Sequence, residues 1–346
     1  MNITSRQKFF QEHFPVEPAF RWKQIEQALF VPEIQGWGGV TTLSKAVRQE
    51  LSAALPWTSF TLKLLADSAD QDTFKALLET VDGKFIETVL MRNRREQWTI
   101  CVSAQVGCAM RCAFCATGKM GLSRNLSSDE IVDQYRFWRT WLLEKFGVEE
   151  RISNVVMMGM GEPMSNYEEV KAALNLLLDY TDLGATKITV STVGILPRLE
   201  QILTDKEWPP VRIAVSLHSA IEETRKKIVP STAPDFIEKL KDWGKRYLKK
   251  CGNRRHHLTF EYVMLSGVND DERHASTLAK LVNSIGDVKV NLIPYHQTSS
   301  GFNRSSEDNM ERFTFILAAK SIIFTVRKSM GEDIQAACGQ LSAELG

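Results

Sequence analysis

Three cysteine thiols lie within eight residues of this sequence, in the stretch Cys108-Ala-Met-Arg-Cys112-Ala-Phe-Cys115. A buried structural cysteine needs no neighbour of its own type, whereas an iron–sulfur cluster is held by several thiolates. Three thiolates on one loop can bind three irons of a four-iron cluster and leave the fourth iron open to a ligand that is not protein. The spacing therefore predicts a [4Fe-4S] cluster with one open iron.

Two other interpretations of these cysteines fit the sequence less well. A structural zinc site takes four ligands, usually as two pairs, and no second pair of Cys or His lies at a suitable distance. A disulfide framework is typical of small, cysteine-dense secreted chains, and six cysteines in 346 residues do not match that class.

The composition is that of an ordinary globular protein, with 43% hydrophobic and 25% charged residues. A formal charge of +1 argues against binding nucleic acid by bulk charge but allows a local basic face. The first residues lack the apolar core of a signal peptide, and no apolar run approaches the roughly 18 residues of a membrane span. These features predict a cytoplasmic protein without a membrane segment.

The hydrophobic pattern divides the chain into two parts. Residues 1–77 show apolar residues at helical spacing, notably over 22–30 and 43–51, which predicts an N-terminal helical accessory domain. Residues 78–346 alternate between strands and helices, and Ser127-Ser-Asp-Glu130 has the form of a capping box. Strands are predicted at 86–91, 98–103, 154–158, 187–190, 212–217, 258–264, 288–293 and 322–326, and helices near 167–178, 234–250, 271–284 and 308–320.

This alternation predicts the α/β class, with parallel strands and crossover helices in a barrel or an open barrel. In such folds the loops after the carboxyl ends of the strands build the active site. Unusual residues follow four of the predicted strands, so we expect them to converge on one pocket. These residues are Gly159-Met-Gly161-Glu162-Pro163, Ser191, Ser216-Leu217-His218 and Pro294-Tyr-His296.

With these motifs and the later Ala337-Cys338-Gly-Gln-Leu341, the chain resembles the RlmN/Cfr family of radical SAM RNA methyltransferases, from about Arg21 to Leu341. The resemblance implies a radical SAM partial (β/α) barrel over residues 78–346, preceded by an RNA-binding domain over 1–77. It also implies a [4Fe-4S] cluster on Cys108, Cys112 and Cys115, with S-adenosylmethionine on the open iron. The family methylates C2 or C8 of an adenosine in 23S ribosomal RNA, and some members also act on tRNA.

The resemblance assigns roles to three further residues. A ring carbon at C2 or C8 is not nucleophilic, so a radical route is needed. Cys338 would take a methyl group from one S-adenosylmethionine as a thiolate, and a 5′-deoxyadenosyl radical from a second would activate that methyl group. Cys101 would release the product by forming a disulfide with Cys338, and Glu87 would accept the proton from the ring.

Cofactor contacts are implied in the same way. Gly161 and Glu162 match the positions that meet the methionine amino group. Ser191 and the segment Ser216-Leu217-His218 match positions that contact the rest of the cofactor. His296 stands where the family usually has asparagine, so the contact there departs from the pattern.

Several alternatives remain open on the sequence. Pro163 after Gly161-Glu162 favours C2 methylation, whereas Ala116-Thr-Gly118 and the spacing from Glu87 to Cys101 look closer to C8 methylation. A non-catalytic, ribosome-associated Fe–S protein would need no Cys338, and a small-molecule radical enzyme would need no helical domain.

Expected partners are ribosomal RNA, tRNA and an electron donor such as flavodoxin, with no membrane, and the chain is expected to be a monomer. Basic clusters at 245–257 and 92–95 could contact RNA.

Overall fold

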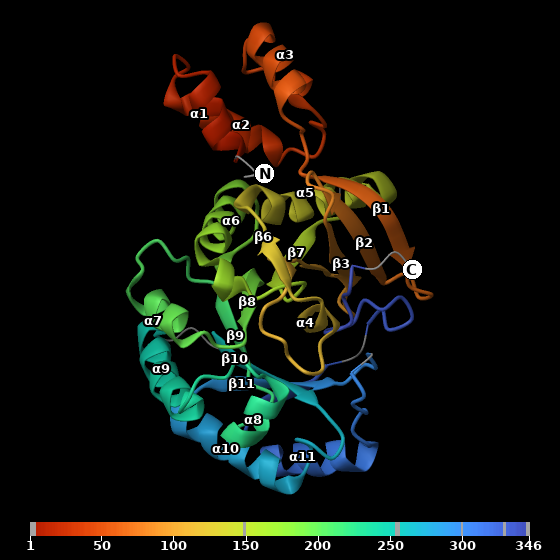
Figure 1. Ribbon diagram of the computed structural model, residues 1–346, viewed down its shortest axis with the longest axis vertical. Coiled ribbons are helices and arrows are strands. Elements are labelled where there is room, and N and C mark those ends of the chain that lie inside the picture. Colours follow the sequence, from red (N-terminus) through yellow and green to blue (C-terminus); the bar gives the residue numbers. More distant parts are fainter. Residues whose placement is uncertain (1–4, 148–149, 253–256, 299, 328–329, 344–346) are drawn as a thin grey trace.

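The protein is described by a computed structural model that covers residues 5–147, 150–252, 257–298, 300–327 and 330–343 (Figure 1). A ten-stranded sheet forms the centre, in the order β1-β2-β3-β4-β7-β8-β9-β10-β11-β12. Its strands are β1 Phe60–Asp67, β2 Thr73–Thr80, β3 Phe85–Arg92, β4 Trp98–Cys101, β7 Ile152–Met157, β8 Ile188–Thr192, β9 Arg212–Ser216, β10 Leu258–Met264, β11 Val288–Pro294 and β12 Phe324–Val326.

The sheet changes character at β4. Strands β1 to β4 pair antiparallel, and every pairing from β4 to β12 is parallel. Helices cross over between the parallel strands and cover the outer face, as Figure 1 shows for α7, α9, α10 and α11. The predicted α/β architecture with parallel strands and crossover helices is therefore confirmed. The helices are α5 Ser128–Phe146, α6 Tyr167–Tyr180, α7 Leu196–Thr204, α8 Glu222–Ile228, α9 Phe236–Cys251, α10 Glu272–Ile285 and α11 Glu307–Ala319.

The predicted helix starts follow from local chemistry. Ser127 caps α5 by accepting from the Glu130 N–H, while the Glu130 side chain accepts from the Ser127 N–H, so the capping box is present. Asp271 caps α10 in the simpler way, by accepting from the His274 N–H. Both helices bury one apolar side against the sheet in a single large core.

The N-terminal helices α1 Arg6–His13, α2 Ala19–Leu29 and α3 Lys45–Ala54 have a small core of their own. The prediction that residues 1–77 are helical is correct for these helices and wrong for residues 60–77. The helical spacing lies within 22–30 and 43–51, whereas residues 60–67 and 73–80 form strands because β1 pairs with β2 and β2 pairs with β3. The expected boundary between residues 77 and 78 falls inside β2, and we propose that the helical unit ends near Trp57.

A buried ionic network joins the helical unit to α5. The guanidinium groups of Arg6 and Arg136 both contact the Asp133 carboxylate, which also accepts from the Ser59 N–H at 2.6 Å. Arg136 Nε donates to the Leu29 carbonyl at 2.7 Å. Burial opposes ionisation of Asp133, but the two guanidinium groups outweigh it and lower its pKa to about 2.

In the part of the chain that the structure describes, none of the helices combines the length and hydropathy that crossing a bilayer requires.

Candidate active site at the mouth of the barrel

The three-cysteine loop connects two short elements, β5 Gln105–Gly107 and α4 Ala116–Met120. Glycines let the backbone fold tightly here. Gly107 has φ +76°, and a Cβ atom at this position would lie 1.9 Å from the Gly121 carbonyl oxygen. A Cβ atom on Gly118 would lie 3.1 Å from the backbone N and O of Cys112. The loop is thereby held as one compact turn.

The thiols of this loop interact with one another electrostatically. Burial raises the pKa of Cys108 to about 11, and the charge of Cys115 adds to the increase. Burial also raises the pKa of Cys112, as do the charges of Cys115 and Cys108. Metal binding deprotonates such thiols. These three thiols fit the ligands of an iron–sulfur cluster, because the positive charge of its irons would stabilise the thiolates.

No three His, Cys, Asp or Glu side chains among the described residues converge closely enough to hold one metal ion. The ligands of a four-iron cluster each bind a different iron, so they need to surround a volume and not a point. Three soft thiol donors on one loop, each interacting with another, meet that requirement.

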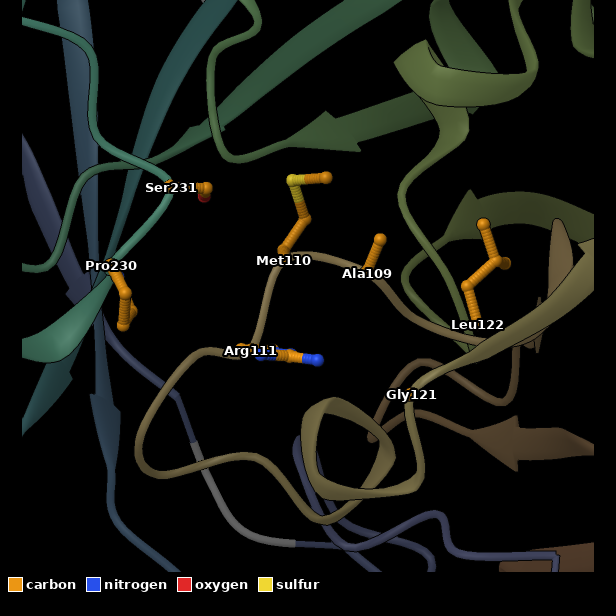
Figure 2. Close-up of a pocket in the computed structure, with 7 residues that line it drawn as sticks. All are labelled: Ala109, Met110, Arg111, Gly121, Leu122, Pro230 and Ser231. Carbon is orange, nitrogen blue, oxygen red and sulfur yellow. The ribbon is translucent and has the colours of Figure 1, made fainter.

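Two cavities adjoin the cysteine loop. The first has a volume of about 490 Å³, and Figure 2 shows Met110 and Arg111 of the loop lying between Pro230 and Leu122. Leu122 is the first residue of the short strand β6 Leu122–Asn125. The second cavity, of about 450 Å³, also borders Arg111 and is lined by Cys112 and Lys119 among others. Apolar and cationic side chains therefore surround the open side of the cysteine loop.

The turn after β7 brings Glu162 towards the cysteine loop. Glu162 is buried, and its two carboxylate oxygens accept from the N–H groups of Met164 (2.9 Å) and Val193 (2.7 Å). Burial raises its pKa above the ordinary value. Gly161 has φ +97°, and a Cβ atom there would lie 2.5 Å from the Cβ of Gln105. This carboxylate can accept from an ammonium group at close approach.

Two serines meet at neighbouring strand ends. Ser191 on β8 and Ser216 on β9 place their hydroxyl oxygens 3.2 Å apart. The backbone N–H groups of Leu217 and His218 both donate to the Glu261 carbonyl, at 2.9 and 3.2 Å. The structure thus brings the predicted residues of β8 and β9 to one side of the site.

His218 is buried and has φ +56°. Its Nδ1 accepts from the Val263 N–H at 3.1 Å, and its ring meets the Phe114 ring edge-on at 4.8 Å. Burial lowers its pKa to about 3, so the ring is neutral. His218 therefore supports the cysteine loop through Phe114, and its Nε2 is the nitrogen left to contact a ligand.

His296 lies after β11 and is also buried. Its Nδ1 is 3.2 Å from a carboxylate oxygen of Glu332, a residue of the C-terminal segment. This contact places the imidazole against that segment.

Sequence reasoning missed Arg225 on α8. Its guanidinium is fully buried and donates to the backbone carbonyls of Val193, Ser216 and Leu217. Burial lowers its pKa to about 9, although the charges of Cys112 and Glu162 favour its charged form. Arg225 thus ties the ends of β8 and β9 together behind the cysteine loop.

Cys101 and Cys338 come from distant parts of the chain and interact at the site. Cys101 is buried at the end of β4, and burial, followed by the charge of Cys338, raises its pKa to about 12. Cys338 reaches solvent, yet the protein atoms around its thiol raise its pKa. The charge of Arg327 favours both thiolates, and that of Cys115 disfavours the Cys338 thiolate.

Glu87 on β3 is buried beside the C-terminal segment. One carboxylate oxygen lies 2.9 Å from Lys75 Nζ, and the other accepts from the N–H groups of Ser342 (2.8 Å) and Ala343 (3.0 Å). The structure therefore places Glu87 against the segment that carries Cys338.

A match to known proteins agrees with this geometry. Residues 102–278 match the radical SAM superfamily. The chain is 40% identical to the ribosomal RNA large subunit methyltransferase N of Nitrosopumilus maritimus (strain SCM1), over 94% of this chain and 93% of that protein. It is also similar to the crystal structure of a radical SAM methyltransferase from Sphaerobacter thermophilus, with 39% identity, a TM-score of 0.88 and 97% of each chain covered.

Proposed function

Because the chain belongs to the family of ribosomal RNA large subunit methyltransferase N, within the radical SAM superfamily, we propose that it methylates C2 of an adenosine in 23S ribosomal RNA and in tRNA. The family resemblance seen in the sequence is confirmed at the level of a radical SAM RNA methyltransferase. The position in the ring, the use of tRNA and the individual residue roles are our proposal.

The family uses a [4Fe-4S] cluster and S-adenosylmethionine. We assign the cluster to Cys108, Cys112 and Cys115, and the tight turn in which the Cys115 N–H donates to the Cys112 carbonyl at 3.1 Å supports the assignment. When bound and reduced, the cluster supplies the electron that cleaves S-adenosylmethionine.

The polar groups around the loop would hold the cofactor. Glu162 would accept from the methionine ammonium, since a nearby cation favours its ionised form and offsets the cost of its burial. Ser191 and Ser216 would donate to or accept from the cofactor's polar groups, and Leu217, His218 and His296 would complete the pocket. Arg225 keeps the strand ends that carry the serines in place.

The observation that carries the proposal is the position of Cys338, which reaches solvent and precedes Gly339, whose carbonyl accepts from the Ala116 N–H at 2.8 Å, directly after Cys115. As a thiolate, Cys338 would attack the methyl carbon of one S-adenosylmethionine, so that a thioether forms on Cys338 and S-adenosylhomocysteine leaves. After the methylene carbon has bonded to the adenine ring, the radical adduct would give up one electron, for which the oxidised cluster would be the acceptor, and lose its ring proton. The Cys101 thiolate would then attack the Cys338 sulfur, and the S–S bond would form as the S–C bond breaks. The electron pair of that bond would stay on the methylene carbon, which would take up a proton to become the methyl group.

Glu87 would accept the ring proton. Its carboxylate is held next to the Cys338 segment by Lys75 and by the Ser342 and Ala343 N–H groups. A general base must lie within hydrogen-bond reach of the proton it removes, and a contact with this segment supports that placement.

RNA would approach over the open side of the cysteine loop. Arg111 and Lys119 could contact phosphates, and Met110 and Leu122 offer apolar surface to an extruded base. On the helical unit, Phe20 is exposed and the Arg21 guanidinium lies 5.0 Å from its ring centroid, an arrangement suited to stacking.

The basic residues predicted to contact RNA are only partly available for it, because some of them bind other groups of the protein. Arg246 is paired with Glu200, and Lys250 Nζ donates to the Ile202 carbonyl at 2.7 Å. Residues 253–256 lie outside the described residues. We further propose an electron donor such as flavodoxin, a cytoplasmic location and a monomeric state.

Methylation at C8 is the second candidate, and the Ala116-Thr-Gly118 sequence after the last cluster cysteine favours it. A non-catalytic Fe–S protein would leave the exposed Cys338 thiol beside Cys101 without a purpose. Pro163 after Gly161-Glu162 is the feature on which we prefer C2.

The test is mass spectrometry of nucleosides after anaerobically reconstituted protein, S-adenosylmethionine and a reductant act on protein-free ribosomal RNA and bulk tRNA. We expect 2-methyladenosine, and the RNA that carries it identifies the substrate. Detection of 8-methyladenosine would mean that the enzyme methylates C8 and not C2. Release of 5′-deoxyadenosine with no methylated adenosine would overturn the proposed substrate.

A further inference from the structure

The segment that carries Cys338 is bound directly to the residues that follow the last cluster cysteine. The Ala116 N–H donates to the Gly339 carbonyl at 2.8 Å, and the Thr117 hydroxyl donates to the Leu341 carbonyl at 2.6 Å. Thr117 is only 3% exposed, so its hydroxyl has no solvent to replace this partner. Figure 1 shows the C-terminal segment passing beside α4.

The same segment is also held on its other side. Glu87 accepts from the N–H groups of Ser342 and Ala343, and the Gln340 side chain links the Ala337 N–H (3.1 Å) to the Gln297 carbonyl (3.3 Å). The backbone around Cys338 is therefore fixed at several points, while the residue still reaches solvent.

We propose that Thr117 is a positioning residue, which fixes the distance of the Cys338 thiol from the cluster loop. This inference rests on the proposed function. Transfer of a hydrogen atom from the methyl group on Cys338 to the 5′ carbon breaks one C–H bond and forms another. It requires the reacting atoms to lie about 3–3.5 Å apart.

Loss of the Thr117 hydroxyl would release one anchor of the segment but leave the cysteine ligands unchanged. The radical would still form, but the methyl group would more often be out of reach. Radical formation and methyl transfer would then become uncoupled.

The experiment compares Thr117→Val with Thr117→Ser. Valine keeps the shape of threonine and removes the donor, whereas serine keeps the donor. We measure the 5′-deoxyadenosine released per methylated adenosine formed. For Thr117→Val we expect this ratio to rise about ten-fold, which is the effect of losing one buried hydrogen bond, with cleavage of S-adenosylmethionine nearly unchanged. For Thr117→Ser we expect the wild-type ratio.

Thr232→Val is the matched control. Thr232 is also buried, and its hydroxyl donates to the Val229 carbonyl at 2.6 Å, so this bond holds no residue of the Cys338 segment. We expect its ratio to stay at the wild-type value. An unchanged ratio in Thr117→Val, or an equal rise in Thr117→Ser or Thr232→Val, would overturn the proposal.

A second readout separates this inference from the proposed function. Hydrogen exchange of the Ser342 and Ala343 amides should become faster in Thr117→Val and not in Thr232→Val, whichever RNA is the substrate. If the wild-type protein methylates no RNA, the proposed function fails, and unchanged exchange in Thr117→Val would overturn the positioning role independently.

Discussion

His218 Nδ1 accepts a hydrogen bond from the Val263 N–H at 3.1 Å, which joins the loop after β9 to strand β10. A protonated Nδ1 could not accept this bond. The neutral ring therefore belongs to the folded state, and the Phe114 contact connects it to the cysteine loop.

The first prediction concerns pH. Burial lowers the pKa of His218 to about 3 in the folded protein, from an ordinary value of 6.5. Below pH 6.5 the unfolded chain gains a proton that the folded chain does not, so His218 lowers stability as the pH falls from 6.5 towards 3. Urea unfolding at about pH 7.5 and about pH 5 should show a smaller loss of stability in His218→Asn than in the wild type. An equal loss in both would contradict the assignment.

The second prediction concerns the network that holds the helical unit. Asp133→Asn removes the carboxylate that the buried guanidinium groups of Arg6 and Arg136 share, leaving Arg6 only its longer pair with Asp129, and should reduce the free energy of unfolding by about 3–5 kcal/mol. Asp182→Asn breaks only the exposed pair with Arg151 and should cost less than about 1 kcal/mol. Chemical denaturation of the two variants makes the comparison, and equal losses would contradict the role of the buried network.

The third prediction concerns Arg225. Arg225→Met removes the donors to Val193, Ser216 and Leu217 and should weaken binding of S-adenosylmethionine to the reconstituted protein about ten-fold or more. Arg246→Met, which breaks an exposed pair with Glu200, is the control and should bind as the wild type does. Equilibrium dialysis measures both, and wild-type affinity in Arg225→Met would count against the account.

The fourth prediction concerns Glu87. Glu87→Gln should still acquire a methyl group on Cys338 but should methylate RNA about a hundred-fold or more slowly, because the proton acceptor is lost. Lys75→Met removes the 2.9 Å ion pair and keeps the carboxylate, so its rate should fall by less. Single-turnover methylation measures both rates. If Lys75→Met were as slow as Glu87→Gln, the ion pair and not the proton acceptor would explain the loss.

Much of the parallel part of the fold was predictable from the sequence. Strands such as β8 and β10 are short β-branched or aromatic runs bounded by turn residues, and the capping box from Ser127 to Glu130 predicts the start of α5 through its own hydrogen bonds. Residues 60–77 were not predictable in this way, because their extended form depends on partner strands: β1 pairs with β2, and β2 pairs with β3.

Some residues of the site could be predicted from the sequence and others could not. Cys108, Cys112 and Cys115 could be found from their spacing, since a cluster needs close ligands on one loop. Arg225 stands among charged residues of α8, in Glu222-Glu-Thr-Arg225-Lys-Lys, and looks like part of a solvated face. Its burial depends on the carbonyl groups of strands that are distant in sequence, so no local pattern reveals it.

The most direct test of the central claim follows the methyl hydrogens. The protein is given S-adenosylmethionine with a trideuterated methyl group, and the methylated adenosine is analysed by mass spectrometry. If Cys338 carries the methyl group and a radical removes one of its hydrogens, the product should retain two deuterium atoms. The Cys338→Ala variant should form no methylated adenosine. A product that retains all three deuterium atoms would mean direct transfer and would contradict the role of Cys338.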